Sequence, residues 1–215
     1  MTSSIVGKAV EDAQGDGRWM SMHNRFISEG RMLNPKVVFL GDSIVFQMQD
    51  KEAWDQYFKP MNALNFGIGG DTVENVLWRL EHGELDCVNP QLFIILVGTN
   101  NHHSTVEEVV EGLELIAWTI QEKKPESKIL FLGLLPRGEK PNKLRDKNME
   151  VNTALERMVP NVPNTTFLNA DPGFVTSSGQ IKPSDMRDYL HLTRHANGKV
   201  CNIIHKHITK TFGIV

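Results

Sequence analysis

Val-Val-Phe-Leu-Gly-Asp-Ser-Ile, residues 37–44, is the stretch that decides the fold. Its four apolar residues, 37–40, are typical of a strand buried on both faces of a parallel sheet, because such a strand has no solvent-facing side. Gly41 and Asp42 mark the end of that strand. Ser43 therefore lies at a carboxyl end, and in open α/β sheets that edge is where ligands bind.

Further apolar runs extend this pattern along the chain. They are residues 63–66, 92–97, 129–135 and 165–168, and segments of helical periodicity separate them. This alternation predicts a three-layer α/β/α fold with a central parallel sheet. With 215 residues, the chain is long enough for one such domain and short for two. We predict a single domain over residues 1–215, in which residues 1–34 form an extension that packs on the domain or on a dimer interface.

Capping signals predict where the helices begin. Asp71 is the expected N-cap of a helix with apolar residues at helical spacing. Ser104 and Glu107 have the spacing of a capping box for the next helix. The apolar spacing predicts two more helices, over residues 145–158 and 196–212.

Composition excludes several classes of function. The net charge of −3 and the pI of about 6.2 give no basic excess for binding nucleic acid. No apolar run approaches the roughly 20 residues that span a membrane, and the N-terminus has no apolar core of a signal peptide. Cys87 and Cys201 do not have the spacing of a metal or redox motif. We therefore expect a cytoplasmic protein with reduced thiols, no nucleic-acid partner and no transmembrane segment.

Three polar, glycine-rich clusters follow the first three predicted strands. They are Gly41-Asp42-Ser43, Gly67-Ile68-Gly69-Gly70-Asp71 and Gly98-Thr99-Asn100-Asn101. In a parallel sheet the three loops meet at one edge, where ester hydrolysis needs a nucleophile and donors for the developing oxyanion. The expected oxyanion hole consists of the backbone N–H groups of Ser43 and Gly70 and the side-chain amide of Asn100.

The residues Asp188-Tyr-Leu-His191 supply partners for the serine. His191 is the predicted general base, and Asp188 would fix its tautomer, so that Ser43, Asp188 and His191 form a catalytic triad. His195 is a second choice for the base. Taken singly, Gly-Asp-Ser is typical of a turn and Asp-x-x-His of a surface pair, so the prediction depends on all the clusters together. His102-His103 has no third ligand at metal spacing, and we predict no metal site.

Together the clusters resemble the SGNH (GDSL-type) hydrolase superfamily, in which Ser43, Gly70, Asn100 and His191 would be the four residues of the name. Longer stretches resemble the catalytic α subunits of intracellular platelet-activating-factor acetylhydrolase type Ib. These stretches are residues 15–26, 64–72, 76–80, 97–101 and 132–142. The likeness covers nearly the whole chain.

This resemblance implies a flavodoxin-like SGNH hydrolase fold and a serine esterase without cofactor or metal. The implied reaction is hydrolysis of the sn-2 acetyl ester of platelet-activating factor and similar short-acyl esters through an acyl-enzyme. Ile44, Thr99 and Leu190 would line a small acyl pocket. The implied partners are a second subunit, in a homodimer or in a heterodimer with a paralogue, and a β-propeller regulatory subunit of the LIS1 type.

Two other functions remain open at this stage. The same chemistry would serve another short-chain ester or an acetylated sugar. Alternatively, the protein would be chiefly a dimeric scaffold for the propeller partner. The intact set of Ser43, Asp188 and His191 argues against a scaffold without activity.

Overall fold

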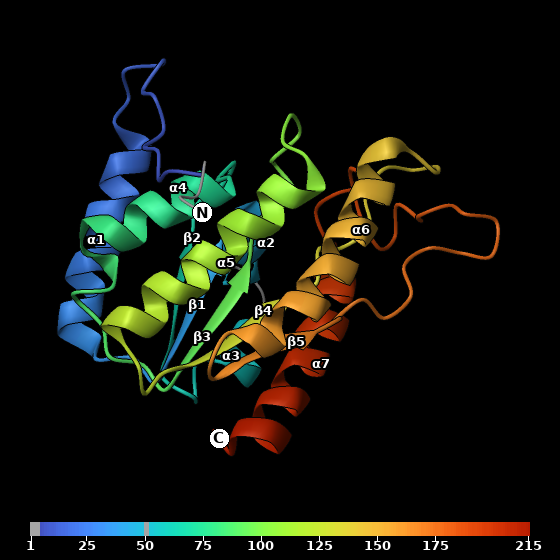
Figure 1. Ribbon diagram of the computed structural model, residues 1–215. Coiled ribbons are helices and arrows are strands. Elements are labelled where there is room, and N and C mark those ends of the chain that lie inside the picture. Colours follow the sequence, from blue (N-terminus) through green and yellow to red (C-terminus); the bar gives the residue numbers. More distant parts are fainter. Residues whose placement is uncertain (1–4, 50–51) are drawn as a thin grey trace.

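A computed structural model describes residues 5–49 and 52–215. Its centre is a five-stranded parallel sheet with the strand order β2-β1-β3-β4-β5 (Figure 1). The strands are β1 (Val37–Gly41), β2 (Ala63–Gly67), β3 (Leu92–Leu96), β4 (Lys128–Leu132) and β5 (Thr165–Leu168). This is the flavodoxin-like order, which changes direction between β1 and β3. The predicted α/β class with a central parallel sheet is confirmed.

Helices cover both faces of the sheet. The helices are α1 (Arg18–Leu33), α2 (Ser43–Met48), α3 (Glu52–Tyr57), α4 (Val73–Arg79), α5 (Val106–Lys123), α6 (Lys143–Met158) and α7 (Arg194–Phe212), with the short turns η1 (Leu80–Glu84) and η2 (Val159–Asn161). On one face α5 packs between α4 and α6, and on the other α3 packs on α7 (Figure 1). Helix α1 packs on η1 and β2, and its Met22 and Phe26 belong to the common core.

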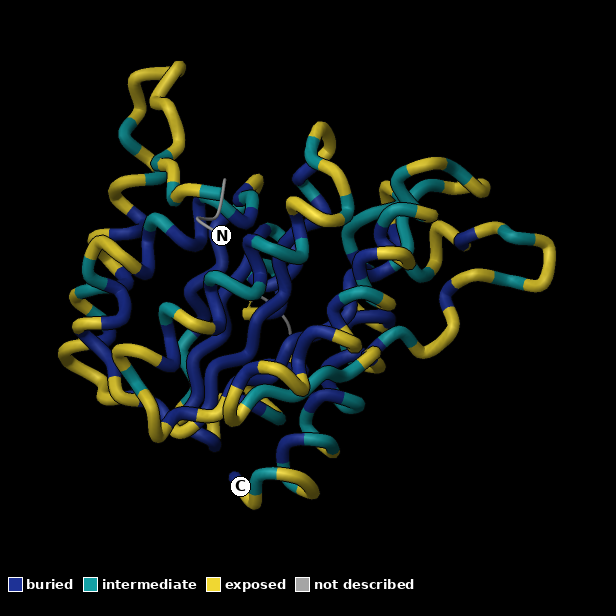
Figure 2. The backbone as a smooth tube through the Cα atoms, viewed as in Figure 1, coloured by how far each residue is buried: buried dark blue, intermediate teal, exposed yellow. Residues whose placement is uncertain are grey.

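The centre of the sheet is deeply buried, as Figure 2 shows by the dark tube of the central strands inside the exposed outer turns. All five residues of β1 and all five of β3 are buried, as expected for central strands. Gly41 is required at the end of β1, because a Cβ there would lie 2.2 Å from the carbonyl oxygen of Leu96. The chain therefore turns out of the sheet directly into Ser43.

Two helices begin one residue later than the capping signals predicted. The N-cap of α4 is Thr72, whose backbone N–H donates to the side chain of Asn75, and not Asp71. The capping box of α5 is formed by Thr105 and Glu108, one residue after the predicted pair. Asp71 is wrong as a cap because its side chain is drawn into the interior, where it accepts hydrogen bonds from other residues.

The run 129–135 forms a shorter strand than predicted, since β4 ends at Leu132. Beyond that point, the side chains of two asparagines of α6 make the backbone hydrogen bonds that a neighbouring strand would otherwise make. Asn152 bonds both the backbone N–H and the carbonyl oxygen of Leu134, and Asn148 donates to the carbonyl oxygen of Leu135. The apolar run stays buried without remaining in the sheet.

Both cysteines, Cys87 and Cys201, are buried and free. In the described part of the chain, no helix has both the length and the apolar character needed to cross a bilayer.

Candidate active site

The register of the sheet brings three loops to one edge. Gly41, the last residue of β1, pairs with Gly67 at the end of β2 and with Leu96 at the end of β3. The three loops therefore leave the sheet at the same level. The first two lie side by side, because a Cβ built on Gly69 would lie 3.8 Å from the Cβ of Ser43.

Ser43 is the first residue of α2, and Asp42 is its N-cap. The Asp42 Oδ1 atom accepts the backbone N–H of Ile44 at 2.8 Å. This bond stabilises the sharp exit from the strand into the helix. The Ser43 side chain is half-buried at that exit.

A chain of hydrogen bonds joins the three residues predicted as a triad. The Ser43 Oγ atom lies 2.8 Å from Nε2 of His191, and Nδ1 of His191 lies 2.6 Å from Oδ2 of Asp188. The carboxylate assigns the ring proton to Nδ1, which leaves Nε2 as the acceptor for the serine hydroxyl. His195, the second choice for the base, is exposed at the start of α7.

The turn from Asp188 to His191 holds the carboxylate in place. Its Oδ1 atom accepts the backbone N–H groups of Leu190 at 3.1 Å and His191 at 2.7 Å. Burial raises the pKa of the Asp188 carboxyl, but the hydrogen bonds from the His191 side chain and from these backbone groups outweigh it and lower the pKa to about 2. Asp188 is therefore ionised at any pH at which His191 acts as a base.

The predicted oxyanion residues lie on the other two loops. Gly70 is exposed and has a φ of 90°, in the region that favours glycine. Asn100 is half-buried, and its Nδ2 donates to the carbonyl oxygen of Asp71 at 3.0 Å. This bond joins the loop after β3 to the loop after β2. An amide nitrogen carries two N–H groups, so Asn100 retains a second one.

The predicted acyl-pocket residues each neighbour a residue of the site in the sequence. Ile44 follows Ser43 and is buried, Thr99 precedes Asn100 and is buried, and Leu190 precedes His191 and packs on the core. Their positions thus follow those of the loops after β1 and β3 and of the segment before α7.

Arg137 contacts the loop that carries Asn100, although its sequence context predicts a solvated loop. The segment after β4 reads as a solvated loop at the mouth of the site, but the Arg137 side chain is half-buried. Its Nη1 donates to the carbonyl oxygen of Thr99 at 2.6 Å and contacts Thr99 Oγ1 at 3.2 Å and His102 Nε2 at 3.1 Å. Arg137 therefore holds the loop that carries Asn100.

A buried cluster of charges beneath the site was not predicted. Arg79 is fully buried, and its guanidinium binds Asp71 at 2.9 Å and Glu84 at 2.7 Å. His23 of α1 in turn lies 3.0 Å from Glu84. The sequence signal that could have indicated this cluster is Arg79, a charged residue at the end of the largely apolar helix α4. A cation buried there requires acidic partners.

Asp42 is a second buried carboxyl. Its pKa is raised to about 7, mainly by burial and also by the charge of Asp71, and the Ile44 N–H and the charge of Arg137 offset this only in part. Its Oδ2 atom has no hydrogen-bond partner among the described residues. The ionised form of Asp42 is therefore unfavourable in the folded protein.

Replacing Asp42 with asparagine should change how stability depends on pH. An acid with a raised folded-state pKa binds its proton more tightly in the folded state, so wild-type stability falls as the pH rises from about 4 to about 7. The slope is about 1.4 kcal/mol per pH unit at most. Asp42→Asn keeps the acceptor for Ile44 and lacks that slope. Urea unfolding from pH 5 to 8 measures the slope of stability against pH, and the exposed Asp55→Asn is the control. Parallel curves of stability against pH for wild type and Asp42→Asn would contradict the raised pKa of Asp42.

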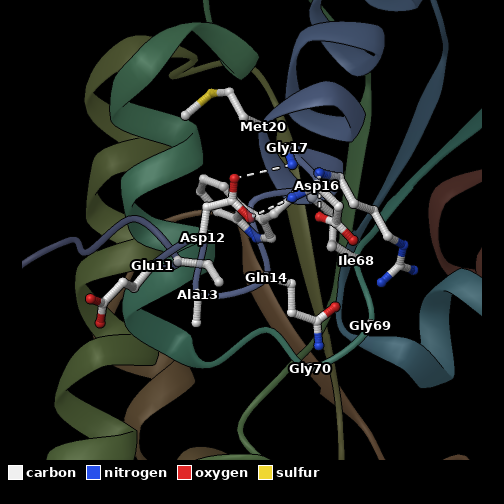
Figure 3. Close-up of a pocket in the computed structure, with 13 residues that line it drawn as sticks. Glu11, Asp12, Ala13, Gln14, Asp16, Gly17, Met20, Ile68, Gly69 and Gly70 are labelled. Carbon is white, nitrogen blue, oxygen red and sulfur yellow. Dashed lines mark hydrogen bonds between the residues drawn. The ribbon is translucent and has the colours of Figure 1, made fainter.

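A cavity of about 380 Å³ adjoins the oxyanion loop. Figure 3 shows Gly69 and Gly70 on one side of it and the segment that contains Glu11, Asp12 and Gln14 on the other. Asp12 shapes that segment by accepting the backbone N–H groups of Asp16 and Gly17, drawn as dashed lines in Figure 3. The cavity thus lies between the N-terminal segment and the loop of Gly70.

Across residues 5–49 and 52–215, no three His, Cys, Asp or Glu side chains gather in a way that would hold a metal ion. His102 contacts Arg137, and desolvation and the charge of Arg137 lower its pKa.

Comparisons with known proteins agree with this architecture. The model of the GDSL-like Lipase/Acylhydrolase family matches residues 39–197. Platelet-activating factor acetylhydrolase IB subunit alpha2 of Homo sapiens is 51% identical over 203 residues, which cover 94% of this chain and 89% of the relative. The alpha1 subunit of Homo sapiens is 49% identical over 196 residues, which cover 91% of this chain and 85% of that one.

The same fold occurs among solved structures. A putative platelet activating factor from Streptococcus pneumoniae superposes with a TM-score of 0.75, at 20% identity, over 88% of this chain and 92% of its own. At this level of identity the likeness concerns the fold.

Proposed function

The chain belongs to the GDSL-like lipase/acylhydrolase family, and from this premise we propose that it is a carboxylic ester hydrolase that removes acetyl groups. Its proposed substrates are the sn-2 acetyl ester of platelet-activating factor and similar short-acyl esters. The observation that carries the proposal is the hydrogen-bonded chain of Ser43, His191 and Asp188 at the carboxyl edge of the sheet.

In the proposed acylation step, the Ser43 Oγ atom attacks the ester carbonyl carbon while Nε2 of His191 takes the hydroxyl proton. The negative charge moves to the carbonyl oxygen, which accepts hydrogen bonds from the Ser43 and Gly70 backbone N–H groups and the second N–H of Asn100. Asp188 stabilises the imidazolium. The C–O bond to the alcohol then breaks, and the alcohol leaves with the proton from His191.

In the deacylation step, water attacks the acetyl-Ser43 ester. His191 takes a proton from the water, the oxyanion forms in the same place, and the proton returns to Ser43 Oγ as acetate leaves. The free enzyme is restored without any other reactant. The cavity beside Gly70 is in a suitable place for the leaving alcohol, because it adjoins the loop that would receive the charge.

A short acyl group is favoured by the neighbours of the proposed catalytic residues. Ile44, Thr99 and Leu190 follow or precede Ser43, Asn100 and His191 directly in the chain. Thr99 is itself held by Arg137 and by Asn148. A pocket formed by these three side chains would leave little room beyond an acetyl methyl group.

Acyl-chain length is the direct test of this proposal. We expect kcat/KM to fall by at least about tenfold from acetyl to butyryl esters of one alcohol, since an overfilled pocket costs roughly 1–3 kcal/mol. Leu190→Ala should lower the ratio of kcat/KM for acetyl esters to kcat/KM for butyryl esters, because it enlarges the pocket. Leu115→Ala, a half-buried leucine on α5, is the matched control and should leave it unchanged. A wild-type preference for butyryl or longer esters would contradict the acetyl pocket.

The names of the relatives describe them as subunits alpha1 and alpha2. We propose that this chain likewise forms a homodimer or a heterodimer with a paralogue, binds a β-propeller regulatory subunit of the LIS1 type and acts in the cytoplasm. Sedimentation of the purified chain, alone and with a purified propeller subunit, measures both associations. A monomer at micromolar concentration that does not sediment with the propeller would contradict them.

A further inference from the structure

Helix α1 places one polar contact on the loop that carries Gly70. It lies beside α4, where the ring of Trp19 packs 5.3 Å from the ring of Trp78 (Figure 1). The indole Nε1 of Trp19 donates to Oδ1 of Asp71 at 2.7 Å. Asp71 is the residue directly after Gly70, so the contact reaches the proposed oxyanion hole from outside the sheet.

The Asp71 side chain is fixed between this indole and a buried guanidinium. Its Oδ2 atom accepts Nε of Arg79 at 2.9 Å. Arg79 is anchored by Glu84 and by the carbonyl oxygen of Phe66, to which Nη2 donates at 3.0 Å. Because Phe66 lies in β2, Asp71 is tied to the sheet on one side and to α1 on the other.

The main chain of Asp71 in turn orients Asn100. Its carbonyl oxygen accepts Nδ2 of Asn100 at 3.0 Å, and its N–H donates to Ile68 at 3.3 Å. An amide group is planar, so one hydrogen bond from Nδ2 restricts the direction of the second N–H. That second N–H is the one proposed to bind the oxyanion.

Gly70 has few restraints of its own. Its φ is 90°, and apart from its two neighbours in the chain no described residue lies within 4 Å of the position that a Cβ would take. The direction of its N–H therefore depends on the residues on either side, of which Asp71 is the anchored one. Loss of that anchor would free both proposed donors together.

The hydrogen bond from the Trp19 indole also affects the charge state of Asp71. The pKa of Asp71 is raised to about 6, mainly by burial and also by the charge of Glu84, although Arg79 and the Trp19 N–H lower it. The Asp42 carboxyl also interacts with Asp71, and His23 contacts Glu84. Without the Trp19 donor the carboxylate has one stabilising contact fewer, so its pKa should rise further.

We propose that Trp19 is a positioning residue of the oxyanion hole, which acts by holding Asp71 and, through it, the Gly70 backbone and the Asn100 amide. The inference rests on the proposed function, since it assumes that these groups receive the negative charge. It gives the N-terminal helix a role in turnover in addition to packing.

The test removes the indole N–H and keeps the aromatic packing. Trp19 is replaced with β-(3-benzothienyl)alanine, which has sulfur in place of the N–H group, and, separately, with phenylalanine. Trp78→Phe is the matched control, because Trp78 belongs to the same aromatic cluster and makes no hydrogen bond to Asp71 within residues 5–49 and 52–215. Ser43→Ala and Asn100→Ala serve as benchmarks for the proposed function. The substrate is ethyl acetate, whose alcohol is too small to need the cavity that Trp19 also lines.

We expect both Trp19 variants to lower kcat by about tenfold with KM within about twofold of wild type, as for an interaction made in the transition state. The acid limb of the kcat profile should move to higher pH, which simple loss of packing would not cause. Trp78→Phe should leave kcat and the acid limb unchanged.

The benzothienyl variant could keep the wild-type kcat and pH profile while Asn100→Ala loses kcat. That result would overturn the role of Trp19 and leave the proposed esterase function intact. The same changes in Trp78→Phe as in Trp19→Phe would overturn it too, because packing would then explain both. Wild-type turnover in Ser43→Ala would instead overturn the proposed function, and this inference with it. If the phenylalanine variant fails to fold, the benzothienyl variant decides, since its shape matches that of tryptophan.

Discussion

Ser43→Ala should lower kcat for acetyl ester hydrolysis by about 10⁶-fold, with substrate binding retained. Alanine leaves His191 without a hydroxyl to deprotonate and the ester carbonyl without a nucleophile. The rate that remains would come from water attack helped by the Gly70 and Asn100 donors. Initial rates on an acetyl ester at pH 8, together with the burst of alcohol released in the first turnover, measure the loss.

The control is Ser28→Ala, an exposed serine on α1, which should keep the wild-type rate. A fluorophosphonate should add its phosphonyl mass to the peptide that contains Ser43 in wild type and in Ser28→Ala, and not in Ser43→Ala. A kcat for Ser43→Ala within tenfold of wild type would show that the nucleophile is another residue.

Asp188→Asn should lower kcat by about 10⁴-fold while the fold stays intact. The carboxylate accepts the N–H of His191 Nδ1 at 2.6 Å. An asparagine can turn its Nδ2 toward the ring and donate instead, which moves the ring proton to Nε2. That nitrogen then can no longer take the proton of Ser43.

The loss in Asp188→Asn should be the same at pH 6 and pH 8, because the pKa of Asp188 is about 2 and wild type is ionised at both. Rates and thermal midpoints at the two pH values test this, with the exposed Asp55→Asn as the control. A loss that disappears at pH 6 would mean that Asp188 titrates near neutrality, against the geometry of its hydrogen bonds.

Much of the architecture was predictable from the chain alone. The apolar runs 37–40 and 92–97 contain the central strands β1 and β3, because a continuous apolar run is suited to burial on both faces. Ser43 and the pair Asp188 and His191 are identified by their residue types and by their place after recognisable elements. These signals are local, or depend on a periodicity that survives without knowledge of the fold.

Helix starts were predicted less well, because several residues near each start have capping side chains. Ser104 and Thr105 are both suitable N-caps, and only the backbone path shows that Thr105 pairs with Glu108. Asp71 has the character of a cap in sequence, yet Arg79 and Trp19 bind its side chain inside the protein. A capping signal is local, whereas Trp19 belongs to α1 and meets Asp71 only in the folded protein.

The sequence by itself determined the class of the fold and the kinds of group at the site: a serine at a strand end, a histidine with a carboxylate three residues before it, and two loops rich in donors. Tertiary structure decided their geometry. Ser43 and His191 are 148 positions apart and meet at 2.8 Å because the segment between β5 and α7, which carries His191, packs at the edge where β1 ends. Arg187 of that segment donates to the side chain of Gln47 in α2, and its Tyr189 carbonyl oxygen accepts the N–H of Gly138. Helix α1 likewise contacts Asp71, 52 positions away, only through the tertiary structure. Local preferences set the elements, whereas distances between distant residues depend on packing and burial, which no short stretch of sequence contains.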